Sequence, residues 1–147
     1  MPIISELDRA RVVIEYLNGA SIDEIRAKYA TSRRIVEKVL ALYGLDYGTR
    51  RLLKSRRMKR VLEALEKAGG ELTFRELSEK TGIPTKYLSM PVSLYSRLGL
   101  IERDGDVIRL TEKGREMLEK IREAERRAEE ARRRAEAILR SLTRYPQ

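Results

Sequence analysis

The side chains best suited to chemistry in this sequence are clustered cations. Arg33 and Arg34 follow Ser32 directly, and a second cluster lies in the stretch RRLLKSRRMKR, which contains no acid. Its seven cations are Arg50, Arg51, Lys54, Arg56, Arg57, Lys59 and Arg60. Seven like charges repel one another unless anions such as phosphates neutralise them. The alternative interpretation is a solvated helix face, which is what most charge runs are.

The charge of the whole chain favours the first interpretation. The 147 residues carry a formal net charge of +9, and 37% of them are charged. Residues 1–60 hold fourteen Lys or Arg and seven Asp or Glu, which gives this segment a net charge of +7. Because such a surface attracts polyanions, nucleic acid is the first partner to consider.

The residue types that are missing argue against an enzyme. The chain has no Cys and no His, so disulfides, thiolate nucleophiles, imidazole bases and the usual zinc ligands are absent. No phosphate-binding loop pattern occurs, and the carboxylates do not have the spacing of metal ligands. We therefore expect no catalytic residues, no cofactor and no metal site.

Localisation and source follow from two further patterns. The N-terminus lacks a signal pattern, and no apolar run approaches the roughly 18 residues needed to span a bilayer. We therefore expect a cytoplasmic protein that does not bind membranes. Asn18 and Gln147 are the only side-chain amides, a bias typical of proteins from hot environments.

The elements that position the first cations are three predicted helices within residues 1–48. Ser5 can cap a helix that ends near Gly19, and Ser21 with Glu24 has the spacing of a capping box. Ser32 can cap a third helix, which ends at Gly44. Two short helices and a longer one, separated by tight turns, are typical of a helix-turn-helix.

The stretch SIDEIRAKYATSRRIVEKVLALYG, residues 21–44, resembles the helix-turn-helix of resolvases, transposases and small regulators. It departs from that pattern at Arg26, where a small residue is usual, and at Ala30, where Gly is common. The resemblance implies that the early outward residues of the last helix enter the major groove of DNA. These residues are Arg33, Arg34, Glu37 and Lys38, while Ser32 and the helix N-terminus can hold a phosphate. The alternative is that they only solvate a surface helix.

Residues 57–110 predict a second set of helices, followed by a hairpin. Apolar residues at helical spacing (Met58, Val61, Leu62, Leu65) define a helix that ends at Gly69–Gly70, and its basic first turns could begin as early as Thr49. Thr73 and Glu76 form a second capping box, and Pro84 can open the next helix. That helix has Leu88, Val92, Tyr95 and Leu98 as its expected inward face. Two short strands then flank Asp104–Gly105.

The run from Leu72 to Gly114 resembles the winged helix of MarR and PadR transcription regulators. The resemblance implies that Thr85, Lys86, Tyr87 and Ser89 face bases or phosphates, and that Arg103 and Arg109 serve the wing. Pro91 inside the presumed recognition helix and the acidic residues of the wing (Glu102, Asp104, Asp106) argue against this role. Because winged helices also bind proteins, protein docking is the alternative.

Residues 111–147 predict a long helix with a heptad seam. The seam consists of Ile121, Ala124, Ala128, Ala131, Ala135, Ile138 and Leu142. An apolar stripe on a lone exposed helix would face water, so we expect it to pair with the same helix of a second chain and form a homodimer. The alternative is a helix that folds back on its own chain.

The sequence thus predicts a mainly α fold. It consists of an N-terminal helix-turn-helix (1–48), a basic helical linker (49–60), a winged helix with a β-hairpin wing (57–110) and a coiled-coil-like C-terminal helix (111–147). The expected function is sequence-selective binding of double-stranded DNA by a dimeric transcription regulator. The alternatives are a partition, replication or recombination protein of a mobile element and a docking subunit of a transcription complex. No residue identifies a small-molecule effector.

Overall fold

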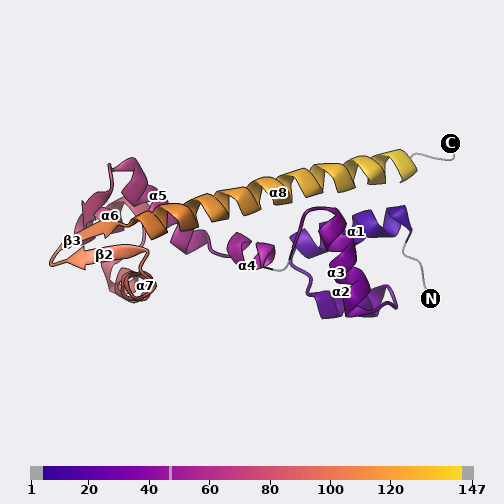
Figure 1. Cartoon of the computed structure of the whole chain (residues 1–147), viewed down its shortest axis with the longest axis horizontal. Coiled ribbons are helices and arrows are strands. Elements are labelled where there is room, and N and C mark those ends of the chain that lie inside the picture. The colour runs from indigo at the N-terminus through magenta and orange to yellow at the C-terminus, as the bar shows by residue number, and fades with distance from the viewer. Residues whose placement is uncertain (1–4, 47, 144–147) are drawn as a thin grey trace. The chain divides into compact units, whose positions relative to one another are not determined.

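The computed structural model describes residues 5–46 and 48–143, and it is mainly helical with one small antiparallel sheet (Figure 1). The described residues form two compact units. The first unit combines residues up to Arg51 with residues from Ala124 onward, and the second is Leu52–Glu123. Within the described ranges, every helix is too short or too polar to cross a membrane.

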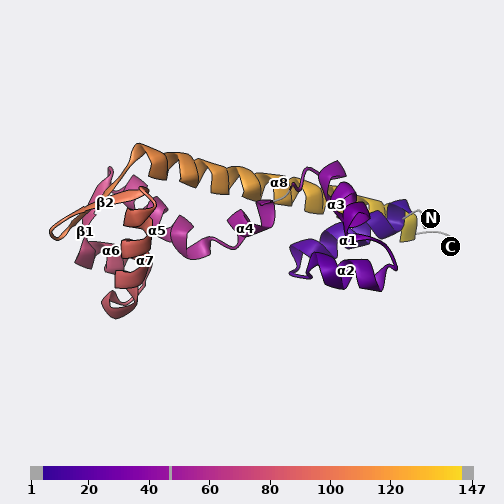
Figure 2. The same cartoon turned by 60° about the horizontal axis from the view of Figure 1, so that its bottom comes forward.

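The first unit is built on α1 (Glu6–Leu17), α2 (Ile22–Lys28) and α3 (Arg33–Leu42) (Figure 2). Ser5, Ser21 and Ser32 cap these helices as predicted, and each hydroxyl accepts a hydrogen bond from the backbone N–H three residues later. Glu24 also accepts a bond from the Ser21 N–H at 3.3 Å, which completes the capping box. The three predicted helix starts are therefore confirmed.

The core of the first unit gathers apolar side chains from all three helices and from the C-terminal half of α8 (Glu112–Thr143). Helical spacing places these side chains on one face of each helix. The buried residues of this core are Ala10, Val12, Val13, Tyr16, Ile25, Val36, Val39, Leu40, Tyr43, Leu45, Ala131 and Ala135.

The second unit contains the predicted helices and hairpin, and a further strand, Glu71–Thr73, precedes the helix that begins at Phe74. It contains α5 (Arg56–Lys67), β1 (Glu71–Thr73), α6 (Phe74–Thr81), α7 (Thr85–Arg97), β2 (Ile101–Asp104), β3 (Val107–Leu110) and the first part of α8. β3 lies between β1 and β2, with Ile108 opposite Leu72 on one side and Arg103 on the other. The predicted hairpin at Asp104–Gly105 and the capping box of Thr73 and Glu76 are confirmed.

The basic stretch 49–60 is helical in two pieces, because α4 (Thr49–Leu53) ends before α5 begins at Arg56. One local prediction in this region is wrong. Leu98, expected to face inward, is 44% exposed, whereas Leu88, Val92 and Tyr95 are buried. Leu98 is the C-cap of α7, and at 100° per residue it lies about 60° from Tyr95 and next to the exposed Leu94, at the edge of the buried face.

Most helices of the chain end in the same hydrogen-bonded turn. After the C-cap of α2, the Ala30 N–H bonds to the Ala27 carbonyl at 3.3 Å and the Thr31 N–H bonds to the Arg26 carbonyl at 2.9 Å, which is a Schellman motif. α1, α3, α5 and α7 form the same pair of bonds with Gly19, Gly44, Gly69 and Gly99 at the position of Ala30. Ala30 has a φ of 52°, and it is the only residue other than glycine with positive φ within the described ranges.

The start of α8 packs directly on the loop that follows α7. Gly114 is buried there, and a Cβ atom at this position would lie 2.1 Å from the carbonyl oxygen of Leu100. The Thr111 hydroxyl donates to the Gly99 carbonyl at 2.6 Å and accepts from the Gly114 N–H at 3.0 Å. Glycine is therefore required for helix and loop to approach this closely.

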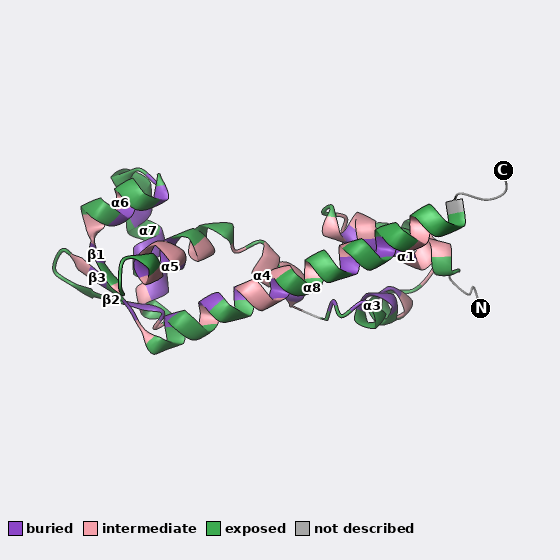
Figure 3. Ribbon diagram, turned by 90° about the horizontal axis from the view of Figure 1, so that it is seen from above, coloured by how far each residue is buried: buried purple, intermediate pink, exposed green. Residues whose placement is uncertain are grey.

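The predicted seam of α8 is largely used within the chain. Ile121, Ala124, Ala131 and Ala135 are buried, and Ala131 and Ala135 belong to the core of the first unit. In Figure 3 the buried residues recur along α8 and exposed residues lie between them. The expectation of a partner chain assumed that this stripe would otherwise face water, and that assumption is wrong for these alanines.

Two of the remaining seam residues, Ala128 and Ile138, are also partly covered by the chain itself. Ile138 is half-buried against the first unit's core, Ala128 is half-buried, and only Leu142 is exposed. The C-terminal part of α8 also forms polar contacts within the first unit. The Arg134 guanidinium lies 4.7 Å from the centre of the Tyr43 ring, and Arg132 donates a hydrogen bond to Asn18 Oδ1 at 3.2 Å. The alternative of a helix folding back on its own chain is therefore the one the structure favours.

Candidate nucleic-acid interface

The outward face of α3 presents two cations one helical turn apart. Arg34 and Lys38 are exposed, and neither forms a hydrogen bond or ion pair with the described residues. At 100° per residue they lie opposite the buried face of α3, which contains Val36 and Leu40. Of the predicted base-reading residues, these two are placed to meet a ligand without first breaking a contact.

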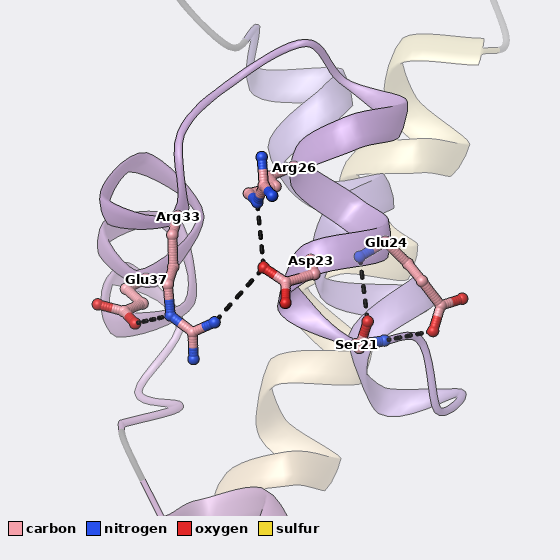
Figure 4. A network of polar contacts seen from close by, with 6 residues as sticks. All are labelled: Ser21, Asp23, Glu24, Arg26, Arg33 and Glu37. Carbon is pink, nitrogen blue, oxygen red and sulfur yellow. Dashed lines mark hydrogen bonds and ion pairs between the residues drawn. The ribbon is translucent and has the colours of Figure 1, made fainter.

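Arg33 is instead held by two carboxylates (Figure 4). Its Nε donates to Glu37 Oε1 at 3.2 Å, and its Nη1 lies 3.5 Å from Asp23 Oδ1. Asp23 also accepts a hydrogen bond from Arg26 Nε at 3.0 Å. This network explains how Arg26 is accommodated where the motif usually has a small residue, because its side chain points to solvent and pairs with an acid on its own helix. Arg33 and Glu37 would therefore have to give up these partners before either could bind a group outside the chain.

A contact between α1 and α2 fixes the helix that precedes α3. The Tyr29 hydroxyl donates to Glu15 Oε2 at 2.5 Å, and Lys28 forms an ion pair with the other oxygen of the same carboxylate. Burial would raise the pKa of Glu15, but the bonds from Lys28 and Tyr29 outweigh it and lower that pKa. Burial and the same carboxylate raise the pKa of Tyr29. Glu15 is therefore ionised and Tyr29 neutral at ordinary pH, which preserves the contact.

Ser32, the N-cap of α3, lies between the turn at Ala30 and the exposed cations of α3. Its hydroxyl oxygen accepts from the Ile35 N–H at 3.2 Å, so the side chain is used as the N-cap of α3. The hydroxyl hydrogen is still able to donate to an acceptor outside the chain. A phosphate at this helix start would also meet the positive end of the helix dipole.

The basic stretch from Arg50 to Arg60 is divided between the two units. Arg50 is turned into the first unit: its Nη1 donates to the Ala20 carbonyl, and its guanidinium lies 4.7 Å from the centre of the Tyr16 ring. That Arg50 faces phosphates stays a prediction, and its half-buried guanidinium would have to keep or give up these contacts to bind one. Arg60 is exposed and donates to the Thr81 carbonyl at 3.4 Å.

The other members of the stretch remain at the surface to different degrees. Arg51 is exposed in the first unit, and in the second unit Lys59 is half-buried while Lys54, Arg56 and Arg57 are exposed. They do not form one continuous helical face, because the chain leaves the helical conformation between α4 and α5.

The predicted contact residues of the second unit fall into an exposed set on α7 and two arginines that are bound on the hairpin. Thr85, Lys86, Tyr87 and Ser89 are exposed at the start of α7, with Lys86 Nζ 5.0 Å from the centre of the Tyr87 ring. The hairpin arginines bind their own unit. Arg103 donates to the Gly105 carbonyl at 3.1 Å and lies over the Phe74 ring, and Arg109 pairs with Glu71 at 3.0 Å and with Asp104 at 3.6 Å. Carboxylates therefore neutralise Arg109, whereas a carbonyl and a ring hold Arg103 in place without neutralising its charge.

Sequence reasoning missed an apolar row on α7. Tyr87, Met90, Leu94 and Leu98 are exposed by 58%, 83%, 44% and 44%, and we refer to these four residues as the α7 stripe. Their spacing of three, four and four residues places them along one side of the helix. The spacing is visible in the sequence, but the expected inward face of Leu88, Val92, Tyr95 and Leu98 has a similar spacing and shares Leu98 with the stripe.

No metal centre is evident among the described residues, since no group of three or more acidic side chains lies close enough to hold an ion. Comparison with protein-family models, with curated proteins and with solved structures finds no match to this chain.

Proposed function

We propose that this chain binds double-stranded DNA through its first unit, with α3 in the major groove, and acts as a sequence-selective transcription regulator. The observation that carries the proposal is the pair of unpaired cations, Arg34 and Lys38, on the face of α3 that points away from the core. The major groove accommodates one helix, and its base edges are read by side chains on the helix's outward face.

The charge of the chain supports the same proposal. The first unit, residues 1–51 and 124–147, holds sixteen Lys or Arg and eleven Asp or Glu, which gives it a net charge of +5. Binding of such a surface to phosphates releases counterions from the duplex. Arg34 is suited to a bidentate contact with guanine, and Lys38 is suited to guanine or a phosphate. Arg33 and Glu37, which already bind each other, would contribute less to binding energy than Arg34, because their ion pair must first be broken.

We infer that the second unit is a winged helix. The support is its order of helix, strand, helix, helix and hairpin, which is the order implied by the resemblance to MarR and PadR regulators. We assign DNA contact to the first unit because Arg103 and Arg109 are bound within the second one. Pairing of two chains through α8 is not part of the proposal, because Ala131 and Ala135 already lie in the chain's own core.

The experiment is selection of preferred duplexes from a random pool at two salt concentrations, followed by titration of the selected duplex with variants. We expect affinity to fall steeply as salt rises, with a slope that reflects the number of phosphates contacted. Arg34→Ala should weaken binding to the preferred duplex by about 1–3 kcal/mol and relax the preference at one base pair.

The matched control is Arg133→Ala, which removes the same charge from an exposed position on α8 in the same unit. It should change affinity only slightly and leave the base preference unchanged. Equal losses for Arg34→Ala and Arg133→Ala would show that net charge, and not α3, determines binding. Binding to random duplex that is weak and insensitive to salt would refute DNA binding altogether.

A further inference from the structure

The α7 stripe is a feature that DNA binding by the first unit leaves unexplained. Met90 is the most exposed large apolar side chain on α7, at 83%, and Tyr87 is exposed by 58%. Scattered apolar residues on a surface are normal, whereas four that follow one side of a helix form a contiguous patch. Such patches mark contact sites for proteins, membranes or ligands.

The polar residues of α7 indicate the charge of the partner. The helix sequence TKYLSMPVSLYSR contains two cations, Lys86 and Arg97, and no acid. At 100° per residue both cations lie beside Met90, along one edge of the stripe. A complementary surface therefore carries apolar residues bordered by negative charge.

The size and charge of the stripe argue against a second copy of the chain. Four partly exposed side chains offer on the order of a few hundred Å², whereas stable protein dimers bury about 800 Å² per partner. Two antiparallel copies of α7 would also bring Lys86 of one copy close to Arg97 of the other, and like charges at an interface are unfavourable. A single helix needs only a row of apolar anchors at i, i+3, i+4 and i+7.

We propose that the α7 stripe binds a short amphipathic helix of a partner protein, in which Asp and Glu border the apolar residues. Leu94 and Leu98 would pack against the partner's apolar residues, and Met90 would adapt to their shape because its side chain is unbranched and flexible. Lys86 and Arg97 would set the direction and charge preference of the partner. This interaction does not depend on DNA binding by the first unit.

The test uses the full chain and two synthetic helical peptides as probes. Both peptides have leucines at i, i+3, i+4 and i+7, and the flanking positions are glutamate in one and lysine in the other. Fluorescence anisotropy of the labelled peptides measures their dissociation constants. We expect the glutamate peptide to bind at least about ten-fold more tightly than the lysine peptide.

Variants of the chain identify the surface. Met90→Ser alone and Met90→Ser with Leu94→Ser should weaken binding of the glutamate peptide, the double variant by about ten-fold or more. Lys86→Glu with Arg97→Glu should reverse the preference between the peptides. The matched control is Leu42→Ser, which removes another exposed leucine (64%) from α3 in the first unit and should leave peptide binding unchanged.

Several results would overturn the proposal. These are failure of wild-type chain to bind the glutamate peptide, equal binding of both peptides, or an equal loss in Leu42→Ser. Sedimentation that shows self-association abolished by the Met90 and Leu94 substitutions, but not by Leu42→Ser, would assign the stripe to a second copy. A loss of DNA affinity in the same double variant would assign it to DNA.

Discussion

Replacing Ala30 by glycine tests whether the turn between α2 and α3 is strained. Ala30 adopts the left-handed conformation, with φ of 52°, at the position where four other helices of the chain have glycine. An L-residue in this conformation costs about 1–2 kcal/mol. Glycine avoids that cost but gains conformational freedom in the unfolded chain, which offsets about 0.4–1 kcal/mol. We therefore expect Ala30→Gly to stabilise the first unit by about 0.5–1 kcal/mol.

The measurement is urea denaturation followed by far-ultraviolet circular dichroism. The matched control is Ala137→Gly, which makes the same substitution at an exposed position in the interior of α8, in the same unit. There glycine should lower the free energy of unfolding by about 1 kcal/mol. The urea transition that this substitution shifts is the one in which the first unit unfolds. The reasoning is refuted if Ala137→Gly destabilises as expected while Ala30→Gly leaves that transition unchanged or lowers it.

Three further changes test other parts of the fold. Ala135→Glu should unfold the first unit, because it places a carboxylate at a fully buried position. Unfolding would be measured as faster hydrogen exchange in α1–α3. A change in oligomeric state without faster exchange would show instead that Ala135 packs against a second chain. Gly114→Ala should destabilise the second unit by about 2 kcal/mol or more, since the new Cβ would clash with the Leu100 carbonyl oxygen, and an unchanged urea midpoint would refute this. The Arg122 hydrogen bond at 2.8 Å lowers the pKa of Glu66 below its ordinary 4.5, so its contribution to stability is present above that pH and is lost as pH falls through the lower, folded-state pKa. Glu66→Gln should therefore flatten the acid limb of the stability profile, and an identical limb in both proteins would argue against this ion pair.

The helix starts and stops were predictable because their causes are local. Ser21 with Glu24, and Thr73 with Glu76, satisfy backbone donors within three residues, so a short stretch of sequence is enough to identify them. The hairpin at Asp104–Gly105 is local in the same sense. Such signals do not depend on how distant segments pack.

The contacts made between elements were not predictable in this way. Apolar spacing in α8 shows that one face is buried, but it does not show whether the chain or a second copy covers it. Likewise, Arg33 and Asp23 meet only because the turn at Ala30 sets the angle between α2 and α3. On α7 two apolar sets have similar spacing, and only packing on the sheet and α5 decides that Leu88 lies inside and Leu94 outside.

The discontinuity of the first unit has a consequence for the order in which the chain folds during synthesis. Residues 52–123 are contiguous, so they emerge together and can collapse as soon as the start of α8 is complete. The core of the first unit is completed only by Ala131 and Ala135, which lie more than seventy residues after Arg51 along the chain. Until these alanines arrive, the apolar core formed by α1–α3 is incomplete, so a nascent chain halted near residue 123 should expose more apolar surface than the full chain.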